Sequence, residues 1–436
     1  MINRYLLYLI PCISLHVFAS TLPWGERRDL ENFFLQAKKN GHSLIEAKNE
    51  SLRRLGDLKE IQGRQLPELS VTALGAPIPS ASGDALNGST DWSKWGFLGR
   101  ISVELRQPIY TFGALSSGKQ AAELGVEAAA LNEKRAEANL YIEVAKIYYS
   151  YQLAFEFKQL AKDIEKNLSK ALKTGQKKKG SRQSVQHSKL QFFLYEAQSR
   201  LKEAEAGQEK ARTAMALKIG SVNKSRPRWD QGNLKKQEFP LAAFDVLKKR
   251  MLEKRPEFKA LKKASEAYYK VFRARGNAYY PQLFLAAKLD WTSSSSRDNQ
   301  SSPFAYDPYN QFAAGIALGL KWDIGWGSKR GELAKSEADY LKAQAEQSYF
   351  SQALVAEFEI AYLESKKWKE IVDHRKQALT LAKKLFQDSY VAYELRNTKQ
   401  KELAEVMQLY VKAKKDYLES LLKYNILTTK LSRMFE

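Results

Sequence analysis

Residues 101–123 decide the fold, and they read ISVELRQPIYTFGALSSGKQAAE. In the first part, Ile101, Val103 and Leu105 alternate with polar residues, which is the period of a half-buried strand. Pro108 is then the last proline before Pro227, and an alanine-rich stretch follows directly. Because a long helix tolerates proline least of all residues, the stretch predicts a strand that leads straight into a very long helix.

The same succession returns later in the chain. A second proline-free run covers residues 309–436, and residues 316–322 alternate in the same way as residues 101–106. Similar residues recur after the same number of positions along the chain. The matches are Leu66-Pro67-Glu68-Leu69 with Tyr280-Pro281-Gln282-Leu283, Gly113 with Gly327, Glu143 with Glu357, Tyr148 with Tyr362, and Arg182 with Arg396. The sequence therefore predicts two copies of one unit.

The first twenty residues have the features of a signal peptide. Arg4 gives a positive start, the apolar stretch 5–17 is too short to span a bilayer, and Val17-Phe-Ala19 resembles a cleavage site. Pro11 precedes Cys12 where a lipoprotein signal needs a small residue, so we do not expect a lipidated N-terminus. The remaining chain has no cysteine, which excludes disulfides and thiolate metal sites.

These observations predict four segments. Residues 1–19 form a signal peptide, 20–220 a first repeat with a strand pair and a helical hairpin, 221–255 a linker or equatorial segment, and 256–436 a second repeat. Breaks at residues 174–180 and 393–397 divide each proline-free run into two antiparallel arms. The first arm of each hairpin would be about 90 Å long at about 1.5 Å per residue. The apolar stripe of Tyr141, Val144, Tyr148 and Tyr151 is expected to pack against other helices.

The predicted strands have the length of transmembrane strands, about ten residues each. Two polar loops, residues 76–90 and 292–303, are expected between the strands and outside the cell. Six aromatic residues are predicted to lie at the membrane surface: Trp92, Trp95, Trp291, Tyr309, Trp322 and Trp326. The alternative is a water-soluble sheet whose aromatic residues pack a core.

Enzymatic and nucleic-acid functions have little support in the sequence. His42, His187 and His374 are far apart, and neither a phosphate-binding loop nor a nucleophile elbow occurs, so we assign no catalytic, metal or cofactor residue. The net charge of +22 would suit nucleic acid, but the positive charge is spread along both repeats and the signal peptide predicts export.

Taken together, the chain resembles the outer-membrane efflux protein family, the TolC-like outer membrane factors. The resemblance covers nearly the whole mature chain, and its motifs are Arg64-Gln-Leu-Pro-Glu-Leu69, Leu105-Arg-Gln-Pro-Ile-Tyr-Thr-Phe-Gly113, Glu143-Val-Ala-Lys-Ile-Tyr-Tyr149, Arg255-Pro-Glu257, Tyr280-Pro-Gln-Leu283 and Trp322-Asp-Ile-Gly-Trp-Gly327. Each motif is loose alone, but their order, spacing and duplication together are specific.

The resemblance implies a mainly helical fold that also has four transmembrane strands per chain. A homotrimer would close a twelve-stranded barrel in outer-membrane lipid and a helical tunnel through the periplasm of a Gram-negative bacterium. Such a protein is a passive exit duct of a tripartite efflux or type I secretion system, and it docks a periplasmic adaptor and an inner-membrane transporter. The alternative is a structural coiled-coil or adaptor-like protein of the cell envelope without a pore. The strand pairs favour the duct, because a purely structural coiled coil has no use for them.

By the same resemblance, the hairpin tips contact the adaptor. The tip residues are Lys177, Lys178, Lys179, Gly180, Arg182, Glu394, Leu395 and Arg396, and those expected at the pore entrance are Lys399, Glu402 and Glu405. The sequence departs from the family here, because Tyr393-Glu394 replaces the usual small-Gly step and Lys399 stands where an acidic residue is common. A cation-attracting ring of carboxylates is therefore not expected at Lys399.

Overall fold

The computed structural model describes residues 28–83, 87–176, 185–221, 232–300, 304, 306–325, 327–395 and 400–435. The predicted signal peptide lies outside these residues, as do parts of the predicted tips. In chain order the elements are α1 (Arg28–Asn40), α2 (His42–Gly63), β1 (Glu68–Ser82), β2 (Ser89–Tyr110), α3 (Ala114–Gln176), α4 (Val185–Lys218), α5 (Phe244–Lys254), α6 (Pro256–Asn277), β3 (Gln282–Ser294), β4 (Gln311–Lys321), α7 (Ser328–Glu394) and α8 (Gln400–Arg433).

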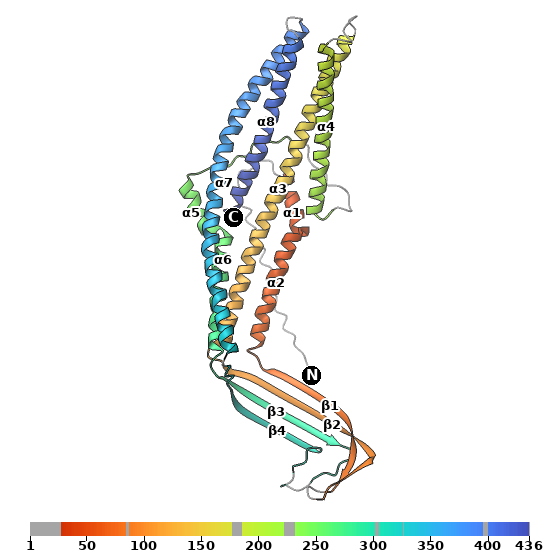
Figure 1. Cartoon of the computed structure of the whole chain (residues 1–436), viewed down its shortest axis with the longest axis vertical. Coiled ribbons are helices and arrows are strands. Elements are labelled where there is room, and N and C mark those ends of the chain that lie inside the picture. Colours follow the sequence, from red (N-terminus) through yellow and green to blue (C-terminus); the bar gives the residue numbers. More distant parts are fainter. Residues whose placement is uncertain are drawn as a thin grey trace, which may run out of the picture.

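Figure 1 shows an elongated molecule with helices along most of its length and a sheet at one end. The predicted long first arms are confirmed, because α3 has 63 residues and α7 has 67. At about 1.5 Å per residue each helix is about 95–100 Å long. Their return arms α4 and α8 begin at Val185 and Gln400, so both hairpins turn at the end of the molecule that lies opposite the sheet (Figure 1).

All four strands form one antiparallel sheet in the order β1-β2-β3-β4. The predicted alternation is confirmed, since Ile101, Val103 and Leu105 lie opposite Trp291, Leu289 and Ala287. The strands are longer than predicted, with 15 residues in β1 and 22 in β2. Apart from one bridge between Ala81, near the end of β1, and Arg297, the outer strands β1 and β4 each pair on one side only, so the sheet has two open edges.

The predicted loop at residues 76–90 is wrong over most of its length. Ala76 to Pro79 pair with Leu98 to Trp95, which extends β1 through two prolines. An edge strand tolerates proline because one side of it makes no hydrogen bonds within the sheet. The predicted loop at residues 292–303 likewise starts too early, because β3 continues to Ser294.

Aromatic rings cover two glycines of the sheet. A Cβ atom at Gly319 would lie 2.5 Å from the ring of Phe284, directly across from it, and one at Gly75 would lie 2.7 Å from the ring of Phe97. Only glycine leaves room for the ring to lie flat over the neighbouring backbone. These contacts help to fix the register of both hairpins.

The main core lies at mid-height in the helical part, where α1 packs beside α3. Tyr141 and Val144 of the predicted stripe are 1% and 0% exposed, and Tyr151 is also buried. Phe34 of α1 meets Tyr141 edge to face at 4.9 Å between ring centroids. The stripe therefore packs against other helices, as predicted.

An extended segment before α5 is held against α8 by one buried amide. Asn425 is fully buried, its Oδ1 accepts a hydrogen bond from the Gln237 amide at 3.0 Å, and its Nδ2 donates to the Lys235 carbonyl at 2.8 Å. Between these contacts, Lys236 pairs with Asp373 of α7 at 2.5 Å. This segment, residues 235–237, is called the strap below.

A second polar contact connects the start of α6 with α7 and α8. The buried Arg255 guanidinium lies 2.9 Å from Glu357, which Lys430 approaches to 2.8 Å, and Arg255 also reaches Glu257 at 3.3 Å. Burial acts to raise the pKa of the Glu357 carboxyl, but hydrogen bonds from Lys430 and Arg255 outweigh it and hold this pKa below its ordinary value.

We predict that Asn425→Leu releases the strap. The leucine has a similar volume but leaves one amide and one carbonyl of the strap without partners, which costs about 1–3 kcal/mol. Hydrogen exchange of the Gln237 amide measures this as a lower opening free energy. The matched control is Ser420→Ala, which is equally buried but removes only a hydrogen bond within α8. Equal protection in Asn425→Leu and the parent would show that the strap is held by other contacts.

We also predict a pH-dependent contribution from Glu357. Because its folded pKa is lowered, its stabilisation is fully present above the ordinary carboxyl pKa and is lost as the pH falls through the folded pKa. Glu357→Gln should therefore lower the free energy of unfolding by about 1 kcal/mol at neutral pH, and less as the pH falls. Guanidinium titrations at several pH values measure the difference, with Glu359→Gln, an exposed neighbour on α7, as the control. A difference independent of pH would contradict this assignment.

Candidate functional site: the sheet and the helical tips

The two faces of the sheet differ in chemistry. One face carries apolar side chains from every strand and no charged residue; among its members are Leu69, Val71, Ile101, Val103, Leu105, Leu289, Trp291, Ile316, Leu318 and Leu320. Several of these are highly exposed, and Ile316 is the most exposed at 78%. A large exposed apolar surface of this kind marks contact with a membrane or with another protein.

The opposite face carries a network of charges. Asp290 accepts hydrogen bonds from Arg100 at 3.1 Å and from Ser102, and Lys288 lies 3.0 Å from Asp290 and 3.2 Å from Glu104. Charges in such a network keep their full hydration only where water reaches them. The sheet is thus built with one apolar face and one face suited to water.

The predicted interface aromatics separate into two groups. Trp92 and Trp95 form an edge-to-face pair at 6.2 Å near the far end of the sheet, and Trp291 lies opposite Phe312. Tyr309 is close to this group in sequence and packs against the guanidinium of Arg297 at 4.5 Å. Trp322 instead lies at the helical end, where its indole N–H donates to the Tyr279 carbonyl at 3.0 Å. Trp326 is outside the described residues.

Sequence reasoning missed the aromatic residues that accompany Trp322. Phe112 stacks on Tyr280 at 5.3 Å and meets Tyr110 edge to face at 4.7 Å. The signal was available, because Tyr110 and Phe112 stand in the quoted motif Pro-Ile-Tyr-Thr-Phe-Gly. The path from Phe312 to Trp322 is about 33 Å at about 3.3 Å per residue, and a strand tilt of about 40° reduces it to about 25 Å. That is the height of the apolar band of a membrane barrel.

The described tip residues are exposed, but most of the predicted tip is not described. Glu394 is the last residue of α7 and Leu395 is its C-cap, and Leu395 is 66% exposed. Glu402 and Glu405 lie in the first turns of α8, with Lys401 3.9 Å from Glu405. A hydrogen bond with Glu394, together with burial, raises the pKa of Tyr390. The residues outside the described ranges are Lys177, Lys178, Lys179, Gly180, Arg182, Arg396 and Lys399.

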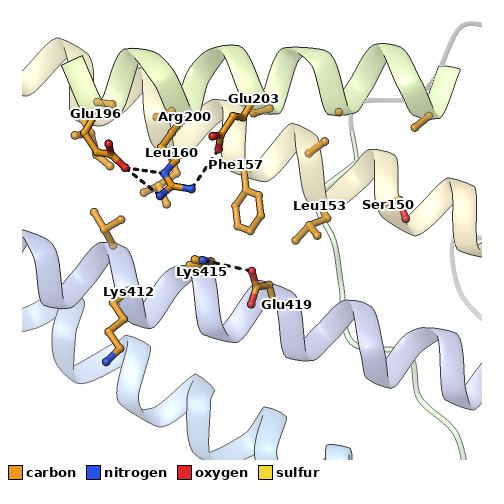
Figure 2. Close-up of a pocket in the computed structure, with 18 of the residues that line it drawn as sticks. Ser150, Leu153, Phe157, Leu160, Glu196, Arg200, Glu203, Lys412, Lys415 and Glu419 are labelled. Carbon is orange, nitrogen blue, oxygen red and sulfur yellow. Dashed lines mark hydrogen bonds and ion pairs between the residues drawn. The ribbon is translucent and has the colours of Figure 1, made fainter. Parts of the chain in front are cut away.

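A groove of about 1090 Å³ is lined by α3, α4 and α8. Figure 2 shows Leu153, Phe157 and Leu160 of α3 in this space. On one rim Arg200 pairs with Glu196 at 3.0 Å and Glu203 at 3.2 Å, and on the other Lys415 lies 3.8 Å from Glu419 (Figure 2). An apolar floor between charged rims is suited to an amphipathic helix.

The described part of the chain contains neither a helix suited to crossing a membrane nor a cluster suited to a metal ion. None of the helices there combines the length and the hydropathy that crossing a bilayer requires. No group of histidine, cysteine, aspartate and glutamate side chains in the same residues has the proximity needed to hold a metal ion.

Comparisons by sequence and by structure give different results. No family model and no curated protein matches the sequence. Solved structures match at low identity: the Campylobacter jejuni CmeC outer membrane channel has 15% identity and a TM-score of 0.78, covering 94% of this chain and 85% of its own.

Two further structures agree with it. The open state of the Neisseria gonorrhoeae MtrE outer membrane channel has 18% identity and a TM-score of 0.75, with 93% of this chain and 88% of that chain covered. The outer membrane protein VceC of Vibrio cholerae has 14% identity and a TM-score of 0.74, with 93% and 97% covered. The chain therefore has the fold of the TolC-like outer membrane factors, the outer-membrane efflux channels.

Proposed function

We propose that this chain is the outer-membrane exit duct of a tripartite efflux or type I secretion system. It conducts substrates passively across the periplasm and the outer membrane, and it has no catalytic role. The observation that carries the proposal is the sheet, which has one largely apolar face without charged residues, a charged opposite face and two open edges, and which continues into helices about 95–100 Å long.

The open edges support an oligomer. The outward backbone groups of β1 and β4 have no partners in the sheet, and lipid cannot supply them. Four strands are too few to close a barrel, since the smallest closed examples have about eight. We propose a homotrimer in which β1 of one copy pairs with β4 of the next, giving a twelve-stranded barrel in the outer membrane and a helical tunnel in the periplasm.

The internal duplication and the segment boundaries belong to the same proposal. The order helix, strand, strand, helix, helix occurs twice, from α2 to α4 and from α6 to α8. We propose residues 20–220 and 256–436 as the two repeats and residues 221–255 as the segment between them. The turns between the paired strands would face the outside of the cell.

The alternative is a coiled-coil or adaptor-like protein of the cell envelope without a pore. The exposed apolar face favours the duct, because a protein in aqueous periplasm would have to cover Ile316, Leu318 and Leu320, which are 64–78% exposed. An inner-membrane transporter and a periplasmic adaptor are the proposed partners. The hairpin tips would receive the adaptor, and the groove between α3/α4 and α8 could take the apolar side of an adaptor helix.

The duct is tested by adding one charge to each face of β4. Ile316→Arg places a guanidinium on the apolar face, where lipid makes it cost about 2–4 kcal/mol near the midplane. Ala317→Arg, the matched control on the next residue, places the same charge on the polar face. We expect Ile316→Arg to reduce the amount of outer-membrane trimer strongly, while Ala317→Arg assembles and conducts in planar bilayers. Equal tolerance of both variants, or a parent protein that is a water-soluble monomer, would refute the duct.

We further propose that the basic tip steers the adaptor. Replacing Lys177, Lys178, Lys179 and Arg182 with Gln should leave the trimer intact, slow adaptor association and flatten its salt dependence, because exposed charges act over a Debye length of about 8 Å. Surface plasmon resonance at several salt concentrations measures the association rate. The control replaces four exposed lysines far from the tips, namely Lys259, Lys262, Lys335 and Lys369. Unchanged association of the tip variant would mean that these residues form only a solvated turn.

A further inference from the structure

A small polar pocket lies where the helices meet the sheet. It has a volume of about 540 Å³ and is formed by the β2–α3 junction on one side and by the C-terminal turns of α6 on the other. Its polar lining includes Ser116 and Ser117 of α3, and Lys270, Arg273 and Asn277 of α6. None of the residues that line it is acidic.

The two cations of this pocket have no protein partner within the described ranges. Lys270 and Arg273 are three residues apart on α6 and so lie on the same face of the helix. Three nearby cations do have partners: Lys263 lies 2.7 Å from Glu127, Arg275 lies 3.4 Å from Glu332, and Lys329 donates to backbone carbonyls. Positive charge is thus concentrated in a pocket without a carboxylate to balance it.

Aromatic rings lie directly beside the cations. Tyr110 and Phe112 belong to the pocket lining, and Tyr280 stacks on Phe112. The side chains of all three are 41–56% exposed. Tyr110 lies opposite Leu283, which places it on the apolar face of the sheet.

The backbone at Phe112 is strained to hold this arrangement. Its φ of 50° lies in the left-handed region, and Phe112 is the one non-glycine residue with positive φ among those that the structure describes. A bulky side chain avoids this region, and such strain persists where the surroundings impose it. Here the strained turn, followed by Gly113 at φ 84°, directs the chain from β2 into α3 and leaves the Phe112 ring beside the pocket.

We propose that this pocket binds the phosphate of a glycerophospholipid headgroup in the periplasmic leaflet of the outer membrane. Lys270 and Arg273 pair with the phosphate oxygens, Ser117 and Asn277 offer further donors, and the acyl chains extend from Tyr110 along the apolar face. The inference rests on the proposed function, because only a membrane-inserted sheet brings lipid headgroups to this level. The combination of aromatic rings at the boundary with cations just beyond it is suited to an anionic headgroup.

The test measures lipid binding to the delipidated trimer by native mass spectrometry. The probe is phosphatidylglycerol. Diacylglycerol supplies acyl chains without phosphate, and inorganic phosphate supplies phosphate without acyl chains. The double variant Lys270→Gln/Arg273→Gln should bind phosphatidylglycerol about tenfold or more weakly, as expected when two charged hydrogen bonds are lost. The parent should prefer phosphatidylglycerol to diacylglycerol, and millimolar inorganic phosphate should not displace the lipid.

Two further variants separate specific binding from net charge and from misfolding. Lys259→Gln/Lys262→Gln removes the same charge at the same spacing on α6, about 17 Å further along the helix, and should bind like the parent. Lys270→Arg/Arg273→Lys keeps both cations, and its affinity for phosphatidylglycerol should stay within about threefold of that of the parent.

Several results would overturn the site. The first is an equal loss of phosphatidylglycerol affinity in Lys259→Gln/Lys262→Gln, and the second is unchanged phosphatidylglycerol affinity in Lys270→Gln/Arg273→Gln. The third is diacylglycerol binding as strong as phosphatidylglycerol binding. The fourth is full displacement of the lipid by inorganic phosphate, which would identify a free-anion site instead. Trimer mass and conductance are recorded on the same preparations. A conducting trimer without phosphate preference refutes the lipid site alone, whereas a parent that forms no conducting oligomer refutes the proposed function and the lipid site together.

Discussion

The structure depends on one requirement, which is that backbone N–H and C=O groups need hydrogen-bond partners wherever water is absent. The helices satisfy this requirement within themselves. The four-stranded sheet does not, because β1 and β4 each leave one row of groups open. Water could hydrate these open groups. The same sheet also has an exposed apolar face, however, and keeping that face in water costs free energy. These open edges, together with the apolar face, are the observations on which the proposal of a closed assembly rests.

The helical part meets a different requirement, because very long helices must keep fixed positions relative to one another. Among the described residues, the largest apolar core lies around α1 and the middle of α3, near Tyr141 and Val144. Two smaller cores lie around Phe358, between α5, α7 and α8, and around Leu168, between α3, α4 and α8. Polar contacts add to these cores: Asn425 holds the strap against α8, and Arg255 links α6 with α7 through Glu357. Buried polar contacts of this kind specify one arrangement because they are costly to leave unpaired.

Much of this fold could be predicted from the sequence, because its signals are periodic and long. The proline-free runs predicted α3 and α7, and the alternation at Ile101, Val103 and Leu105 predicted the apolar face of β2. The ends of the strands were harder to predict. Pro77 and Pro79 are typical of a loop, and only the pairing of β1 with β2 shows that they lie on an edge strand. The strap and the pocket beside Lys270 could not be predicted, because each combines residues far apart in sequence that no local pattern connects. The tips, where the family resemblance assigned most of the functional residues, stay predictions.

The position of the core along α3 also has a mechanical meaning. About 50 Å of helix separates Tyr141 from the last residues of α3 near Gln176, and along this arm a smaller cluster around Leu168 packs the α3/α4 hairpin against Met407 of α8. A tilt of the hairpin about the Tyr141 core as its fulcrum carries the Leu168 cluster with it. Tilting the hairpin by about 5° displaces its end by about 4 Å, because displacement grows with the length of the arm. Repacking by a fraction of an ångström at the fulcrum is thereby converted into a movement the size of a side chain at the tips.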